Sequence, residues 1–209
     1  MKIVLRQTVS VVDHGIGNIR SVTNALEVSG YDSQLVRHPD ELKNASIVVL
    51  PGVGNFGGVM NAIQKNGLHE AIRDYVFQDR PFLGICVGMQ VLFQGSAESP
   101  DSNGYGFFRG ELNHLSCLDS TKVTPSVGWK ELIHTGNADG HALKEAYFVH
   151  SYFAAGIDDA DLISSYIWEG HKVPGHVGRG RVHGVQFHPE KSRLEGLRFL
   201  HGVLRDISK

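Results

Sequence analysis

The cysteine flanked by glycines at position 86 is the residue of this sequence best placed for covalent chemistry. Cys86 stands between Gly84 and Gly88. A buried strand predicted over residues 81–85 precedes it and a helix is predicted to follow, which is the pattern of a nucleophile elbow with cysteine in the serine position. The glycines would let strand and helix approach closely, and the helix N-terminus would favour the thiolate. We expect the N–H of Val87 to face any oxyanion formed there.

Twelve histidines are available as the base that such a nucleophile needs, and the neighbours of His188 support that role. It follows an apolar strand predicted over residues 182–187 and precedes Pro189 and Glu190. Residues two apart in an extended chain point to the same side, so Glu190 would orient the His188 ring. A surface histidine at a strand end is the alternative. With Cys86, these residues would form a Cys-His-Glu triad if the fold joins the two segments.

A glycine-rich segment, residues 51–58, follows the strand predicted over residues 47–50. It formally matches the G-x-G-x-x-G dinucleotide pattern, but Pro51 interrupts the tight turn, and the acidic residues further on fall within a predicted helix. We therefore favour a different role, in which the backbone N–H groups of Gly52, Val53 and Gly54 approach a substrate carbonyl and complete an oxyanion site.

Two other residue types need a separate interpretation. Cys117 is expected to pack as a small buried hydrophobic residue. The histidines at positions 171, 176, 183 and 188 are separated without an established ligand spacing, so we expect no metal and no cofactor.

The elements expected around these residues alternate between strand and helix in the first half of the chain. Strands are expected over residues 8–13, 47–50 and 81–85, and helices over residues 18–28 and 59–77. This order favours a parallel sheet covered on both faces. The second half reads as more antiparallel, with strands over residues 129–133, 147–149, 162–167 and 182–187 before a helix over residues 195–207.

Length and composition exclude several classes of protein. The 209 residues are expected to form one domain, residues 1–209. Twenty Lys and Arg face 22 Asp and Glu without blocks of like charge, which argues against a nucleic-acid partner. No long apolar run or targeting segment is visible, so we expect no membrane association and a cytoplasmic location. Two cysteines are too few for a disulfide framework.

Three segments together, residues 84–90, 186–191 and 51–54, resemble the class I (triad) glutamine amidotransferases. Two more, residues 13–22 and 148–152, are similar to the glutaminase subunits of that family that serve histidine biosynthesis, and the resemblance spans nearly the whole chain. It implies a single-domain α/β fold with a central, mostly parallel sheet, flanking helices and additional antiparallel strands. It also implies that a cysteine attacks the side-chain amide of L-glutamine and releases ammonia.

The resemblance implies roles for particular residues. Cys86 would be the nucleophile, His188 the base and Glu190 its partner. The glutamine-binding set would be Gly52, Val53, Gly54, Val87, Gln90, Glu98, His150, Ser151 and Tyr152, with Val53 or Gly54 completing the oxyanion hole after a rearrangement triggered by a partner. That partner would be a (β/α)8-barrel cyclase subunit, bound as a heterodimer, which receives ammonia through an internal channel. Its interface would include Asn18, Trp129, Tyr147 and Lys191.

The sequence departs from the family pattern at three positions. His14 stands where the family usually has Tyr, and Ser126 and Lys130 replace the His and Asn of a His-x-Gly-Trp-Asn stretch. These changes fall on the expected partner side, so a similar glutaminase that feeds a surface-sugar amidination enzyme is the alternative. A non-catalytic binding module is disfavoured because all three triad residues are present. A cysteine peptidase is disfavoured because the Gln90 amide suits a small polar substrate.

Overall fold

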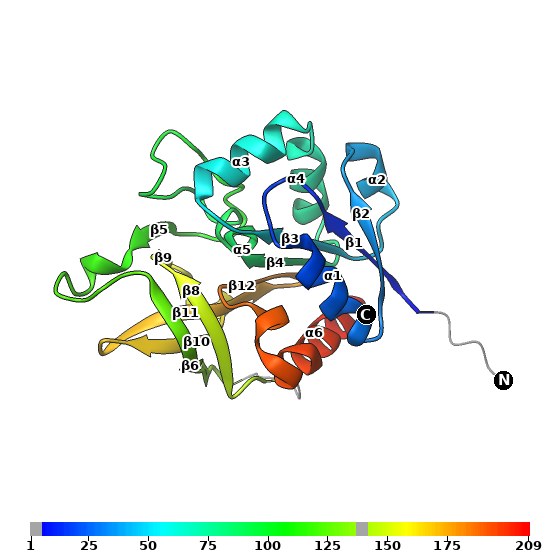
Figure 1. Ribbon diagram of the computed structural model, residues 1–209. Helices are drawn as coiled ribbons and strands as arrows, with labels where there is room; N and C mark the ends of the chain where they lie inside the picture. Colours follow the sequence, from blue (N-terminus) through cyan, green and yellow to red (C-terminus); the bar gives the residue numbers. More distant parts are fainter. Residues whose placement is uncertain (1–5, 137–141) are drawn as a thin grey trace.

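The main sheet of the protein has eight strands and two directions. The computed structural model describes residues 6–136 and 142–209 (Figure 1), so residues 1–5, where the sequence was searched for a targeting segment, lie outside it. The sheet order is β2-β1-β3-β4-β12-β11-β10-β7. The parallel strands are β1 Thr8–Val12, β2 Asp32–Val36, β3 Val48–Gly52, β4 Phe82–Cys86 and β12 Val182–Val185. The antiparallel strands are β11 His171–Arg179, β10 Leu162–Trp168 and β7 Ile133–His134.

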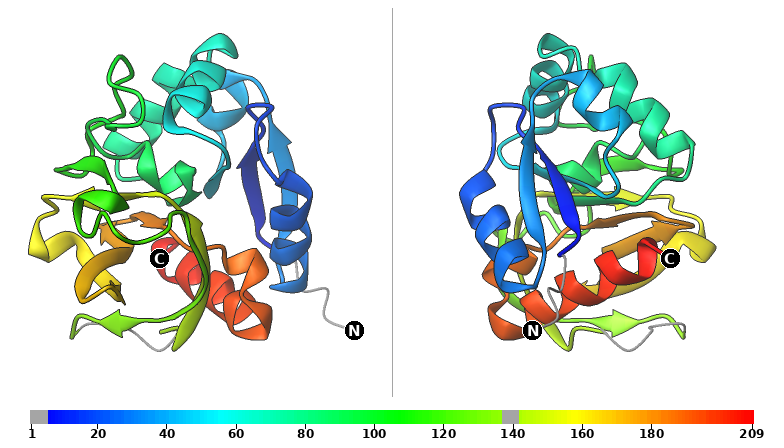
Figure 2. Two further views of the ribbon diagram at one scale, coloured as in Figure 1. Left: turned by 60° about the vertical axis from the view of Figure 1, so that its left-hand side comes forward. Right: turned by 90° about the vertical axis from the view of Figure 1, so that its right-hand side faces the viewer.

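Helices cover both faces of this sheet. Helices α1 (Ile19–Val28) and α6 (Arg193–Ile207) pack together on one face, and α3 (Phe56–Lys65) and α4 (His69–Phe77) lie on the other (Figure 2). The short helix α2 (Pro39–Lys43) packs against α4. Every residue of β3 and β4 is buried, as expected for central parallel strands covered on both sides.

Two small antiparallel sheets stand beside the main sheet. One pairs β5 (Glu111–His114) with β9 (Tyr152–Ala155), and the other pairs β6 (Ser126–Glu131) with β8 (Glu145–His150). Both lie toward β10 and β11, away from the β1–β2 edge (Figure 1). Strands β8 and β9 are separated only by Ser151, so the turn between them links the two sheets.

The expected α/β architecture is confirmed, with corrections to individual elements. The helix predicted over residues 59–77 is two helices, because the chain turns at Gly67, whose φ is +69°. The strand predicted over residues 129–133 is divided between β6 and β7, which belong to different sheets. Strands β2, β5, β9 and β11 and helix α2 were not expected. Strand β2 was missed because its Asp, Ser and Gln residues hide the periodicity of an edge strand.

The topology places three separate segments at one edge of the sheet. Strands β3, β4 and β12 are neighbours and run parallel, so their carboxyl ends lie side by side. Gly52 at the end of β3 pairs with Cys86 at the end of β4, and His188 lies three residues beyond Val185 of β12. Ligands of open α/β sheets bind at such carboxyl edges. None of the helices in the described part of the chain combines the length and apolarity needed to span a bilayer.

Candidate active site

The strand-to-helix turn at Cys86 has the strained backbone of a nucleophile elbow. Cys86 has φ 55° and ψ −112°, a conformation that L-residues rarely adopt. A Cβ added at Gly84 would lie 2.3 Å from the carbonyl oxygen of Gly88, and one added at Gly88 would lie 1.8 Å from that of Leu50. Both glycines are therefore required by backbone contacts, as the sequence predicted.

The helix that follows Cys86 is shorter than expected. Helix α5 spans only Val87–Gln90, so it supplies little of the macrodipole that was expected to favour the thiolate. Its first residues still present backbone N–H groups beside Cys86, which is itself 5% exposed. Electrostatic support for Cys86 must therefore come mainly from a neighbouring side chain.

That neighbour is His188, which forms a buried pair with Glu190. The His188 Nδ1 and Glu190 Oε1 atoms are 2.8 Å apart, and both side chains are at most 3% exposed. Because the carboxylate accepts, Nδ1 carries the hydrogen. The contact is as predicted, but its origin differs, since residues Pro189–Lys191 form a 3₁₀ turn rather than extended chain. The turn brings the two side chains together.

The electrostatics of this pair favour a charged imidazole. Burial lowers the pKa of His188, but the side chains of Cys86 and Glu190 outweigh it and raise the pKa to about 9. His188 is therefore protonated at neutral pH. Its Nε2 atom is buried and makes no hydrogen bond to the described residues, which leaves it available to Cys86 and to a molecule bound beside it.

A cavity of about 350 Å³ opens over Cys86 and His188. Every residue of the expected glutamine-binding set lines this cavity except Gly52, which is the strand partner of Cys86. The complete lining is Val53, Gly54, Cys86, Val87, Gln90, Glu98, Pro125, Val149, His150, Ser151, Tyr152, His188 and Lys191. Pro125 and Val149 were not anticipated, and Lys191, expected at an interface, also reaches the cavity.

Amide side chains connect the floor of the cavity to Cys86. Gln90 Nε2 donates to Gln186 Oε1 at 3.0 Å and to the Tyr152 carbonyl at 3.3 Å. Gln186 Nε2 in turn lies 3.7 Å from Cys86 Sγ. The sequence analysis assigned no role to Gln186, although its position two residues before His188 would have placed it on the same side of the chain. Glu98 Oε2 accepts from the Phe56 N–H at 2.8 Å.

His150 is held by hydrogen bonds in another part of the cavity wall. Its Nδ1 donates to the Tyr152 carbonyl at 2.9 Å, and its Nε2 lies 2.8 Å from the Tyr166 hydroxyl, whose oxygen is also 3.3 Å from Ser126 Oγ. Because the carbonyl only accepts, Nδ1 carries the hydrogen and Nε2 accepts from Tyr166. Burial lowers the pKa of His150 to about 4, so this ring is neutral and shapes the wall by hydrogen bonding.

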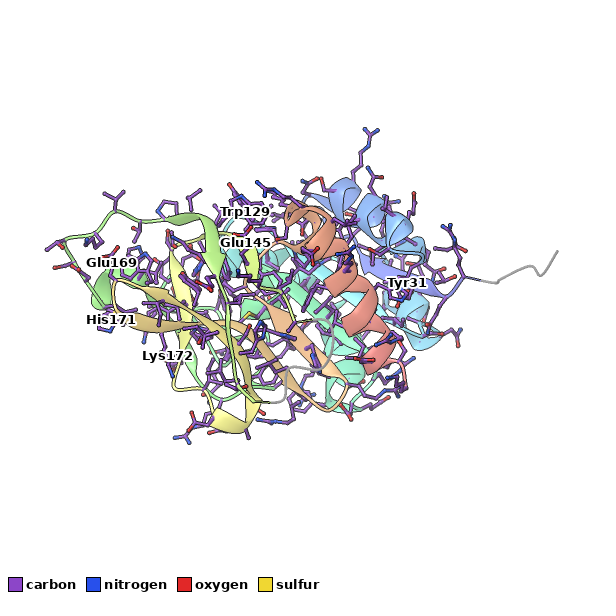
Figure 3. The ribbon with its side chains drawn as sticks, turned by 90° about the horizontal axis from the view of Figure 1, so that it is seen from below. Tyr31, Trp129, Glu145, Glu169, His171 and Lys172 are labelled. Carbon is purple, nitrogen blue, oxygen red and sulfur yellow. The ribbon has the colours of Figure 1, made fainter. Side chains whose placement is uncertain are left out.

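The residues expected at a partner interface gather beside this site. Trp129 and Tyr147 are paired across β6 and β8, with ring centroids 6.1 Å apart. Lys191 lies over Tyr147, and Arg193, which the sequence analysis did not single out, lies over Trp129 at 4.4 Å. Figure 3 labels Trp129 near the start of α6.

Asn18 lies in a second cavity that reaches the triad. It caps α1, accepting from the Ser21 N–H, and lines a small cavity shared with His188 and Glu190. The four expected interface residues are thus all near the triad, but they do not form one cluster of mutual contacts.

Two further expectations concern cysteine and metal. Cys117 is exposed, so its expected burial is wrong. It lies in a single 3₁₀ turn, Leu115–Cys117, where only Leu115 is buried. His176 and His183 contact each other at 3.0 Å. Across residues 6–136 and 142–209, no group of three or more His, Cys, Asp and Glu is arranged to hold a metal ion.

The fold and site define an α/β protein with a cysteine elbow beside a histidine–glutamate pair, and comparison with known proteins identifies the family. The glutamine amidotransferase class-I model matches residues 10–202. The chain belongs to the class-I glutamine amidotransferase family.

Similar proteins share most of the chain. It is 42% identical over 199 residues to imidazole glycerol phosphate synthase subunit HisH of Bacillus licheniformis, covering 92% of this chain and 93% of the relative. It is 39% identical to subunit HisH of Methanopyrus kandleri, covering 96% and 99%. Imidazole glycerol phosphate synthase hisHF of Arabidopsis thaliana is also 39% identical, with 96% of this chain but only 35% of that longer relative matched.

A solved structure described as a crystal structure of glutamine amidotransferase has the same fold. Its TM-score is 0.76 with 18% sequence identity, and the match covers 96% of this chain and 98% of that one.

Proposed function

We propose that this chain is a glutaminase subunit that hydrolyses L-glutamine to glutamate and ammonia and delivers the ammonia to a cyclase of histidine biosynthesis. The cyclase would use it to make imidazole glycerol phosphate and an aminoimidazole carboxamide ribotide. The observation that carries the proposal is the meeting of Cys86, His188 and Glu190 at the carboxyl ends of adjacent parallel strands. Identity of 42% to a HisH subunit supports the narrower assignment.

In the proposed reaction, Cys86 Sγ attacks the side-chain carbonyl carbon of glutamine and forms a tetrahedral oxyanion. Protonated His188 gives its Nε2 proton to the amide nitrogen and the C–N bond breaks. Ammonia departs, and a γ-glutamyl thioester remains on Cys86. A water molecule then attacks the thioester while neutral His188 accepts a proton from it, and the intermediate collapses to the γ-carboxyl group of glutamate and the Cys86 thiolate, which restores the thiolate beside protonated His188. Glu190 acts by holding Nδ1 and stabilising the imidazolium.

Backbone N–H groups would stabilise the oxyanion. Val87 follows Cys86 directly, and the segment 52–54 lies beside it because Gly52 pairs with Cys86. Val53 and Gly54 both line the cavity, and Gly54 has a φ of +92°, which glycine adopts without strain. A peptide in this segment would supply the second donor, and its orientation would respond to the partner.

The size and charge of the cavity suit one amino acid. About 350 Å³ is at the low end of ligand-binding cavities. Glu98 would face the α-ammonium group, while Gln90 and the backbone of residues 150–152 would bind the remaining polar groups. Two of these glutamine-binding residues, Gln90 and His150, are held in position by hydrogen bonds to Gln186 and to the Tyr152 carbonyl, respectively.

Two observations support a cyclase barrel as the partner. The half-buried Trp129 and Tyr147 and the cations Lys191 and Arg193 lie together beside the cavity, and aromatic residues and Arg are enriched in protein interfaces. In the hisHF relatives of Arabidopsis thaliana and Schizosaccharomyces pombe, the matched region is 35% and 38% of a longer chain. The additional chain is long enough for a (β/α)8 barrel.

The test is a glutamine hydrolysis assay on the purified chain alone, with a cyclase barrel subunit, and with that subunit and its nucleotide-derived acceptor. We expect low activity alone and a rise of about 10²- to 10³-fold when the oxyanion site is completed. Cys86→Ala should abolish the activity, and the exposed Cys117→Ala should leave it intact. Hydrolysis by Cys86→Ala at the wild-type rate would overturn the proposal. Absence of any response to the cyclase would favour the surface-sugar amidination partner instead.

A further inference from the structure

His14 makes a buried contact that the proposed mechanism does not use. It follows β1, is 2% exposed, and its Nε2 atom lies 2.8 Å from the carbonyl oxygen of Pro51. Because a carbonyl only accepts, Nε2 carries the hydrogen and the ring tautomer is fixed. The other nitrogen, Nδ1, is buried and makes no hydrogen bond to the described residues. The ring therefore has one strong polar contact, and it is with Pro51.

Pro51 is the residue directly before the proposed oxyanion segment 52–54. Its carbonyl belongs to the peptide that continues into Gly52, and Gly52 pairs with Cys86. At the other end of the segment, Ile16 lies 4.0 Å from the position of a Cβ on Gly54. The loop 13–18 therefore flanks the segment, with His14 bonded to the residue before it and Ile16 beside Gly54 at its end.

The backbone that carries His14 is itself anchored. The Asp13 N–H donates to the Val36 carbonyl, and Asp13 Oδ1 accepts from the Gly15 N–H at 3.2 Å. Arg37 Nε donates to Asp13 Oδ2 at 2.8 Å. Burial lowers the pKa of His14 despite opposing effects of Pro51 and Asp13, so the ring is neutral near pH 7 and keeps its single N–H on Nε2.

We infer that His14 is a positioning residue for the oxyanion site, because its bond to the Pro51 carbonyl fixes the direction in which the peptides of residues 52–54 point. The inference rests on the proposed glutaminase function. Pro51 has no N–H of its own, so its carbonyl is the only backbone polar group of that residue through which the segment can be held. Without the His14 bond, the glycine-rich segment rotates and its N–H turns away from the oxyanion.

The test uses His14→Leu, which removes the donor at similar volume, and His14→Gln, which keeps an N–H able to reach Pro51. Turnover and KM for glutamine are measured with the cyclase partner present. The alkylation rate of Cys86 by iodoacetamide is measured in parallel, because that displacement needs the thiolate but forms no oxyanion. The matched control is His201→Leu, which removes a histidine bond to the Ser29 carbonyl between α6 and α1.

We expect His14→Leu to lower kcat about 10- to 100-fold, part of the loss that follows removal of an oxyanion donor. KM and the alkylation rate should stay within about twofold of wild type, and His14→Gln should recover most of the lost kcat. An unchanged kcat in His14→Leu would overturn the inference, as would a parallel fall of kcat and alkylation that His14→Gln does not recover. Absence of glutamine hydrolysis in the wild-type complex would instead overturn the proposed function.

Discussion

The parallel and antiparallel parts of the molecule hold the site in different ways. Around β3 and β4 the site is held by close packing of one backbone segment on another, because a methyl group at Gly84 or Gly88 would collide with a neighbouring carbonyl. Around β8 and β9 it is held by side-chain hydrogen bonds, such as those of His150 to Tyr152 and Tyr166. The first region should therefore be damaged most by added volume, and the second by a change of charge or by loss of a polar group.

The largest effect on turnover is expected at His188, the proposed base at the carboxyl edge of the parallel strands. His188→Ala removes the acid and base of both proposed steps, and we expect kcat to fall about 10²- to 10⁴-fold. Glu190→Gln keeps the shape and the contact with Nδ1 but loses the charge, so its loss should be smaller. Both are measured by glutamine hydrolysis in the presence of the partner. Wild-type turnover in His188→Ala would remove that residue from the triad.

A side chain added at the elbow should lower the stability of the fold strongly. Gly88→Ala places a Cβ against the Leu50 carbonyl oxygen, and we expect the free energy of unfolding to fall by about 3 kcal/mol. The control is Gly136→Ala, because no atom of the described residues beyond its chain neighbours lies within 4 Å of a Cβ built on Gly136. That change should stay within about 0.5 kcal/mol in urea unfolding. Equal stability of the two variants would show that backbone contact does not define this region.

A change of charge should act on the antiparallel region through His150. Its pKa of about 4 in the folded protein lies below the ordinary value of 6.5, so the unfolded chain binds the proton first as pH falls. Stability is therefore lost between about pH 6.5 and pH 4. Between pH 7.5 and 5, His150 should account for about 2 kcal/mol of the loss. Urea unfolding of wild type and His150→Asn at pH 7.5 and pH 5 measures this contribution. If His150→Asn loses as much stability between the two pH values as wild type, the prediction is wrong.

An effect of similar size, on partner binding and not on stability, is expected on the partner face. Trp129→Ala should weaken binding of the cyclase by about 2 kcal/mol, the scale of an aromatic interface residue, while leaving alkylation of Cys86 unchanged. Phe77 is the control, because this aromatic side chain is 53% exposed at the end of α4, whereas the half-buried Trp129 lies in β6. Titration of the partner by calorimetry measures both variants. Equal affinities for Trp129→Ala and Phe77→Ala would place the interface elsewhere.

The same division explains what the sequence could predict. The elbow at Cys86 was predicted in detail because its determinants, two glycines and a buried strand, are local. The contact of His188 with Glu190 was also predicted, although a turn rather than extended chain produces it. By contrast, the bonds from Tyr166 to His150 and from Gln90 to Gln186 join separate elements, 16 and 96 residues apart in the chain. No short-range pattern contains them, because they depend on how the strands are paired.

Surface positions were predicted least well. Cys117 was expected to be buried because of its residue type, but a single exposed turn carries it. Arg193 was missed because its stacking on Trp129 depends on the turn before α6 and on the pairing of β6 with β8. Such contacts depend on the packing of separate elements, which hydrophobic periodicity does not describe.

The central claim, that Cys86 carries out covalent glutamine hydrolysis, is tested most directly by acid-quenching the complex of wild-type chain, cyclase and acceptor during turnover with glutamine. Intact-mass and peptide analysis should then find a γ-glutamyl group on Cys86 and none on Cys117. The adduct should be absent from Cys86→Ala. Glutamine turnover by a wild-type complex that never carries an adduct on Cys86, matched by turnover in Cys86→Ala, would contradict the account.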